Sequence, residues 1–233
     1  MPEVTIPADA RRLVSQHVDV SRETLDALAA YVALLTEWQA KTNLIAPSTI
    51  PDLWSRHILD SAQLARFAGD APVAWVDLGT GAGLPGMILA LLLGRERLAA
   101  PMLLVESNAK KVAFLHHARS ELGAYVEILP SRIESSATQS RITVCSLVSA
   151  RALAPLGQLI IWSAPALRAG GRAVFPKGRR VDEEIAALGN EAKLFRIIRH
   201  PSVVDSEGCI LEITADVRPA EGTARPSASR DED

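Results

Sequence analysis

Residues 76–86, with the sequence VDLGTGAGLPG, decide the fold of this 233-residue chain. One apolar run ends here in a cluster of glycines and a second begins at Pro85, a pattern that predicts a strand, a tight turn and a helix. Gly81, Gly83 and Gly86 satisfy the spacing G-x-G-x-x-G, which is typical of turns that bind dinucleotides. Because glycine has no side chain, a ligand can approach the backbone closely at such a turn.

Three residues around this turn bear on which ligand it binds. Asp77 ends the strand, where a carboxylate would repel a pyrophosphate but would suit the cationic methionyl part of S-adenosylmethionine. Pro85 removes a backbone N–H from the start of the helix, where a phosphate would need it. Glu106 ends the next apolar run, a place from which a carboxylate accepts hydrogen bonds from ribose hydroxyls in either cofactor. These residues favour S-adenosylmethionine; the alternatives are a nicotinamide-dependent oxidoreductase and a turn that binds no ligand.

Strand-like and helix-like segments alternate after residue 72. We expect strands over 73–78, 102–106, 125–129, 142–149 and 172–176, and helices over 85–93, 110–122, 153–167 and from residue 183. Two further strands, 194–199 and 209–214, are joined without a helix, which predicts an antiparallel pair at one edge. The fold class is therefore α/β, a Rossmann-like, mostly parallel seven-stranded sheet with helices on both faces.

A helical extension precedes the sheet. Apolar residues recur at three- and four-residue spacing over 21–40, and a second helix is expected over 51–67, with Pro51 in its first turn. We therefore predict an extension over 1–70 and a domain that binds S-adenosylmethionine over 71–217. The remainder, 218–233, is rich in Pro, Ala, Ser and charge, a composition that predicts a disordered tail.

Composition excludes several classes of protein. The chain is 48% hydrophobic and 22% charged, as is typical of a soluble globular protein. It has neither the ~20-residue apolar run of a membrane span nor the pattern of a secretory signal. Cys145 and Cys209 are too few for a disulfide framework and wrongly spaced for zinc. We therefore expect a cytoplasmic protein with two buried, reduced thiols and no metal.

The net charge of −2 hides an asymmetry along the chain. Segment 151–199 contains nine basic and four acidic residues, so the rest of the chain is acidic. A basic segment in an acidic protein is expected of a surface that binds a polyanion such as RNA. The alternative is a solvated face without a partner.

Several motifs then occur in a fixed order and carry a family resemblance. They are the segments 38–44, RHILDS at 56–61, 77–86, KKVAFL at 110–115, SRIE at 131–134, SARA at 149–152 and Lys177-Gly178. Together they resemble the bacterial RsmG family, also called GidB, of small-subunit ribosomal RNA methyltransferases, over roughly residues 20–215. The resemblance implies a class I methyltransferase fold and S-adenosylmethionine as methyl donor. It also implies N7 of one guanine of 16S rRNA, guanine-527 in the usual RNA numbering, as acceptor.

The resemblance also assigns site residues. It places Gly79, Leu84, Ile133, Glu134 and Arg151 at the cofactor, with Arg151 reaching the substrate as the catalytic residue. The turn itself adds Asp77, Gly81, Gly83 and Glu106 to the cofactor site. The residues expected at the RNA are Arg56, Lys110, Lys111, Arg132 and Lys177. The chain departs from the family at Gly208, where many members have an arginine.

The expected chemistry needs no proton-abstracting base. Guanine N7 offers a lone pair and carries no proton, so catalysis should come from alignment and electrostatics. We expect no catalytic triad, and we expect His116 and His117 to be packed or solvated. His57, beside Arg56 in the second helix, is as consistent with helix packing as with an RNA contact. The resemblance implies 16S rRNA or the 30S subunit as the partner, and nothing in the sequence demands more than a monomer. The alternatives are methylation of another RNA or of a small molecule, and a catalytically silent RNA-binding protein.

Overall fold

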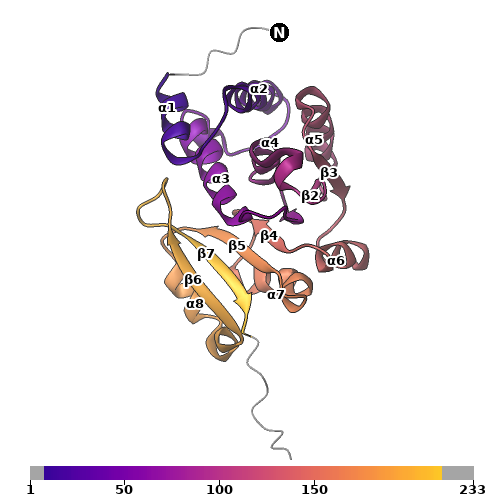
Figure 1. Cartoon of the computed structure of the whole chain (residues 1–233), viewed down its shortest axis with the longest axis vertical. Coiled ribbons are helices and arrows are strands. Elements are labelled where there is room, and N and C mark those ends of the chain that lie inside the picture. Colours follow the sequence, from indigo (N-terminus) through magenta and orange to yellow (C-terminus); the bar gives the residue numbers. More distant parts are fainter. Residues whose placement is uncertain (1–7, 217–233) are drawn as a thin grey trace, which may run out of the picture.

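The structure is a computed structural model and describes residues 8–216. Its centre is a seven-stranded sheet in the order β3-β2-β1-β4-β5-β7-β6 (Figure 1). The strands are β1 Trp75–Leu78, β2 Met102–Glu106, β3 Val126–Pro130, β4 Leu147–Ala150, β5 Arg172–Lys177, β6 Phe195–Pro201 and β7 Cys209–Ala215. Only β7 runs antiparallel to its neighbours β5 and β6. The carboxyl ends of β1 to β5 therefore meet at one edge, where ligands of open α/β sheets bind.

Helices cover both faces of the sheet. Those on one face are α4 Gly86–Arg97 and α5 Ala109–Leu122, and those on the other are α6 Ser136–Thr143, α7 Leu156–Arg168 and α8 Val181–Ala186, followed by the 3₁₀ helix η4 Gly189–Leu194. Each face has its own apolar cluster, so the sheet is buried between two layers of side chains. The expected Rossmann-like α/β fold is confirmed.

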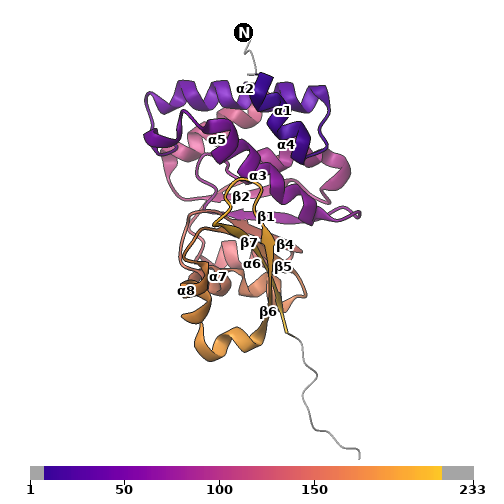
Figure 2. The same cartoon turned by 90° about the vertical axis from the view of Figure 1, so that its left-hand side faces the viewer.

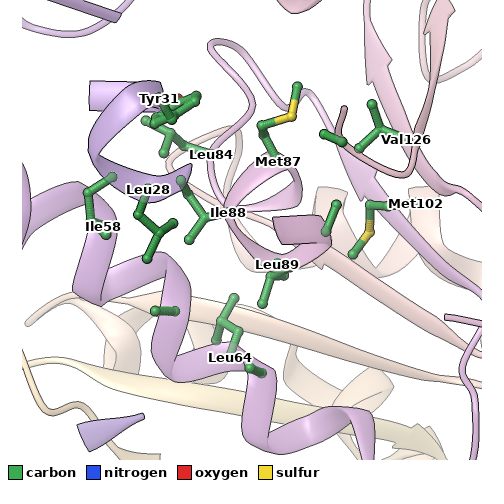
Figure 3. Close-up of a cluster of buried hydrophobic side chains, with 14 of the residues drawn as sticks. Leu28, Tyr31, Ile58, Leu64, Leu84, Met87, Ile88, Leu89, Met102 and Val126 are labelled. Carbon is green, nitrogen blue, oxygen red and sulfur yellow. The ribbon is translucent and has the colours of Figure 1, made fainter. Parts of the chain in front are cut away.

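The N-terminal helices lie over α4 and α5 (Figure 2). They are α1 Ala8–His17, α2 Arg22–Gln39, the 3₁₀ turn η1 Pro47–Thr49 and a helical segment made of η2 Trp54–Leu59, α3 Asp60–Ala62 and η3 Gln63–Ala68. The η2 part of that segment is a π-helix. Leu28 and Tyr31 of α2 and Ile58 of η2 project toward Ile88 of α4 and Leu84 (Figure 3). The extension thus shares one hydrophobic core with this face of the sheet.

Two expectations about secondary structure are wrong. The strand expected over 142–149 is only the four residues of β4, because α6 continues to Thr143. Ser135 caps that helix by accepting a hydrogen bond from the Thr138 N–H at 3.2 Å, and Thr138 and Ile142 form its buried stripe. The polar sequence of α6 concealed its period, and α1 was missed altogether. The antiparallel final pair is confirmed, with β7 inserted between β5 and β6. The expected tail over 218–233 lies outside the described residues.

Candidate functional site

Asp77 shapes the glycine loop, residues 79–86, that follows β1. Its carboxylate is fully buried and accepts hydrogen bonds from Thr80 Oγ1 at 2.5 Å, Ser149 Oγ at 2.7 Å and the Gly86 N–H at 2.9 Å. Burial raises the pKa of Asp77 to about 6, and these three donors act against burial by favouring the charged form. The side chain therefore fixes the position of the loop against β1 and β4, and all three bonds go to protein groups.

Most backbone N–H groups of the loop are used within the chain. Those of Gly83 and Leu84 both donate to Thr80 O at 2.9 Å, and that of Met87 donates to Gly83 O at 2.7 Å. Pro85 has no N–H to offer. A pyrophosphate would need these groups at the start of the helix, so the loop is poorly suited to a dinucleotide.

Gly81 is where the loop is open to a ligand. A β-carbon on Gly81 would meet no atom closer than 3.9 Å, whereas one on Gly79 would come within 2.5 Å of Leu153 and one on Gly86 would press into Leu104. Glu106, at the end of β2, accepts the Gly81 N–H at 2.9 Å through Oε2. A carboxylate therefore lies beside the one open glycine position of this loop, an arrangement that can accept hydrogen bonds from a ligand's hydroxyl groups.

The remaining cofactor residues from the sequence follow β3 or complete the loop. Ile133 is 8% exposed and belongs to the second apolar cluster, while Glu134 is exposed beside it. The side chain of Leu84 is 5% exposed and packs near Tyr31, so it faces the core. Tyr31, which the sequence did not single out, donates a hydrogen bond from its hydroxyl to Ala82 O at 2.8 Å. The helical extension thus supports the glycine loop.

Arg151, directly after β4, is held by the helical extension. Nη1 donates to Arg56 O at 3.0 Å and to Asp60 Oδ2 at 3.1 Å, and Nη2 lies 2.8 Å from His57 Nδ1. The side chain is 15% exposed. We call Arg56, His57, Asp60 and Arg151 the Arg151 clamp. All three partners come from the RHILDS motif. The motif marked these residues in the sequence but did not show that they bind the Arg151 guanidinium.

The structure contradicts the expectation that Lys177 faces RNA. Its side chain is only 9% exposed, and Nζ donates to Glu184 Oε2 at 2.7 Å and to Ala154 O at 3.1 Å. Glu184 also accepts the Leu156 N–H at 2.7 Å. Glu184 neutralises the charge of Lys177. The lysine therefore stabilises the segment between Arg151 and α7 and does not offer a free charge to RNA.

The other expected RNA residues are on the surface. Lys110 and the half-buried Lys111 line an open cavity of about 290 Å³ between the end of α2 and the start of α5, with Lys41, Asn43 and Asn108. The side chains of Arg56 and Arg132 are exposed near the edge where the carboxyl ends of the parallel strands meet. The basic segment 151–199 is partly neutralised by the ion pairs of Arg151, Arg172, Lys177 and Arg199. Its exposed basic residues include Arg168, Arg179, Arg180, Lys193 and Arg196.

Other expected features are placed as follows. Cys145 is buried and burial raises its thiol pKa to about 11, but Cys209 is only half-buried. His116 is exposed, and His117 stacks on Trp38 with ring centroids 5.4 Å apart. Within residues 8–216, His, Cys, Asp and Glu do not gather in a group of three that could hold a metal. In the same part of the chain, helices long and apolar enough to cross a membrane are absent.

The fold and the site at its carboxyl edge define a class, the Rossmann-like class I methyltransferases. The magnesium protoporphyrin IX methyltransferase of Synechocystis PCC 6803, solved with bound SAM, superposes with a TM-score of 0.53 at 12% identity, covering 79% of this chain and 97% of that one. A protein of Corynebacterium glutamicum gives a TM-score of 0.54 at 19% identity over 89% and 96% of the two chains. At these identities the likeness concerns the fold.

Sequence comparison then narrows the class to one family. A model of the GidB family, described as rRNA small subunit methyltransferase G, matches residues 24–207. The ribosomal RNA small subunit methyltransferase G of Methylobacterium sp. (strain 4-46) is 46% identical over 210 residues, which cover 90% of this chain and 97% of the relative. That of Methylobacterium nodulans is 48% identical over 199 residues, 84% and 91% of the two chains. The chain belongs to the rRNA small subunit methyltransferase G family.

Proposed function

We propose that this protein transfers a methyl group from S-adenosylmethionine to N7 of one guanine, guanine-527, in 16S ribosomal RNA. The observation that carries the proposal is the open backbone at Gly81 beside the Glu106 carboxylate, at the sheet edge from which Arg151 also extends. Family membership supports the reaction class and the small-subunit rRNA as substrate.

The residues present fit S-adenosylmethionine. The open face at Gly81 admits the cofactor. Each Glu106 oxygen accepts one backbone N–H, from Gly81 and from Asn108, which leaves lone pairs for the ribose hydroxyls. Ile133 and Glu134 offer an apolar side chain and a carboxylate to the adenine. When bound, the cofactor supplies an electrophilic methyl group on a positively charged sulfur. Asp77 acts on it indirectly, because its carboxylate is occupied in holding the loop.

The acceptor requires positioning and no deprotonation. N7 of guanine is a hydrogen-bond acceptor with a free lone pair, so methyl transfer needs the two reacting atoms in line. His57, the histidine beside Arg151, has hydrogen-bond partners at both ring nitrogens and is not free to act as a base. A guanidinium beside the site can donate to the guanine O6 or to a phosphate, which gives Arg151 its catalytic role.

The basic surface around the edge suits the RNA backbone. Lys110 and Lys111 begin α5 after β2, Arg132 follows β3, and Arg56 belongs to the Arg151 clamp. Lys41 joins the two lysines around the cavity at α5. Lysine and arginine side chains neutralise phosphates and fix the register of the RNA. We further propose that the protein binds the 30S subunit or 16S rRNA in the cytoplasm. It acts as a monomer, because one chain carries all the residues of the proposed site.

The test is methyl transfer from labelled S-adenosylmethionine to 16S rRNA and to 30S subunits that lack the modification, followed by mapping of the methylated nucleoside. We expect 7-methylguanosine at guanine-527 with the wild type and little with Arg151→Ala. Label at another nucleotide or in a small molecule would replace the proposed target. RNA binding without any transfer would indicate a catalytically silent RNA-binding protein.

A further inference from the structure

We infer that His57 is a positioning residue for Arg151, which it holds as a neutral hydrogen-bond acceptor from the helical extension. The inference rests on the proposed function only in calling Arg151 catalytic. Nη2 of Arg151 lies 2.8 Å from His57 Nδ1, and Nη1 donates to Asp60 and to the Arg56 carbonyl. One face of the RHILDS segment therefore supplies an acceptor to both terminal nitrogens of the guanidinium.

The chemistry of the partners fixes the state of the imidazole. A guanidinium can only donate, so Nδ1 must accept and cannot carry a proton. On the other side of the ring, Nε2 lies 2.7 Å from Thr49 Oγ1, which itself donates to Ala46 O at 2.7 Å. A hydroxyl has one proton, so Thr49 must accept from an N–H on Nε2. Both ends of the chain of hydrogen bonds thus demand the neutral Nε2–H tautomer.

The charges around His57 favour the same state. Arg151 and the Arg56 side chain are positive, and Thr49 is uncharged; Asp60 pairs with Arg151. Burial first, and then Arg151 and Arg56, lower the pKa of His57 to about 4. At neutral pH the ring therefore accepts from Arg151 and adds no competing charge.

The clamp is itself braced from the far edge of the sheet. The second carboxylate oxygen of Asp60 accepts from Gln63 Nε2 at 2.9 Å, and Gln63 Oε1 accepts the Val203 N–H from the β6–β7 connection at 3.0 Å. His57 and Asp60 face the same side of the helical segment, since both contact the guanidinium of Arg151. The π-helical turn from Trp54 to Leu59 that carries His57 is a rare form that occurs frequently at functional sites.

The kinetic test compares His57→Ala with His57→Asn, whose side-chain oxygen can accept where Nδ1 did. We expect His57→Ala to lower single-turnover methyl transfer about tenfold or more, with affinity for S-adenosylmethionine within about twofold of the wild type. His57→Asn should recover most of the loss. The double variant His57→Ala/Arg151→Ala should be no slower than Arg151→Ala alone, because the two act as one unit. His116→Asn, an exposed histidine on α5, is the matched control and should leave the rate unchanged.

The second measurement is independent of the RNA target. A long-range ¹H–¹⁵N spectrum of the histidine rings should show His57 as the Nε2–H tautomer near neutral pH, and Arg151→Ala should raise its pKa by removing a positive neighbour. Additive losses in the double variant, no recovery with asparagine, or an Nδ1–H ring would overturn the inference. A correct tautomer and coupling together with methylation at an unexpected nucleotide would leave the inference standing and contradict only the proposed target.

Discussion

The glycine loop and the Arg151 clamp lie at the same edge of the sheet but are built differently. Asp77 holds the loop mainly through partners three and nine positions away in the chain, Thr80 and Gly86. The clamp joins Arg151 to residues 91 to 95 positions earlier. The proposed cofactor half of the site thus depends mostly on local contacts, with Ser149 and Tyr31 as its distant partners. The proposed catalytic half exists only when the helical extension is docked on the domain. Substitutions in the two regions should therefore affect different steps.

The largest effect should come from Arg151 itself. Arg151→Ala removes a charge from the proposed site of methyl transfer, and we expect single-turnover transfer to fall by about 10²-fold or more. Arg151→Lys should recover only part of this, because an ammonium cannot reproduce the planar fork that meets Asp60, His57 and the Arg56 carbonyl. Cofactor affinity, measured by calorimetry, should change far less than the rate. An equal loss in both would mean that the clamp and the loop are one unit.

The opposite pattern is expected at Gly81. Gly81→Val fills the open face of the loop, so affinity for S-adenosylmethionine should fall at least about tenfold. The control is Gly123→Val. Gly81 and Gly123 have φ of 61° and 59°, so valine causes similar backbone strain at both positions. Gly123, however, caps the far end of α5, away from the loop. Calorimetry showing equal affinity for the two variants would mean that the cofactor does not lie against Gly81.

This difference in construction also decides what the sequence could reveal. The strand, glycine turn and helix from β1 to α4 have a local pattern, so the loop, Glu106 and the parallel sheet were predictable from it. The partners of Arg151 and Lys177 were not, because ion pairs between distant elements leave no periodicity in the chain. The motif RHILDS marked His57 and Asp60, yet only packing shows that they hold a guanidinium. In α6 the Ser- and Thr-rich sequence concealed a helix that tertiary contacts stabilise.

Lys177 gives a smaller effect and separates structural from RNA-binding charges. Lys177→Met leaves Glu184 partly buried without its partner, and we expect the free energy of unfolding to fall by about 1–3 kcal/mol. The salt dependence of RNA binding should not change. Arg180→Met, at an exposed neighbour, should do the reverse, lowering the salt slope by about one unit with little effect on stability. Denaturant titrations and binding assays at several salt concentrations check both.

The smallest effect is a pH dependence of stability. The pKa of His57 is lowered to about 4 in the folded protein, so the unfolded chain binds more protons between that pH and about 6.5, and acid should destabilise the fold. Asp77, with its pKa raised to about 6, acts in the opposite direction over a similar range. Denaturant unfolding at several pH values gives the slope of the free energy of unfolding against pH for the wild type and for His57→Asn. Subtracting the second slope from the first removes the contribution of Asp77, which both proteins share. This difference should be positive, with stability rising with pH; a zero difference would mean that His57 is not held neutral.

The central claim, that the site positions its reactants and abstracts no proton, is tested most directly by the pH dependence of single-turnover methyl transfer to 30S subunits. N7 of guanine needs no base, so the rate should be flat between about pH 7 and pH 9, where neither His57 nor Asp77 titrates. A rate that still rises above pH 7, as the upper part of a limb with a histidine-like midpoint that changing His57 or His117 abolishes, would contradict this claim. The acceptor would then be a group that must lose a proton, such as an exocyclic amine or a ribose hydroxyl.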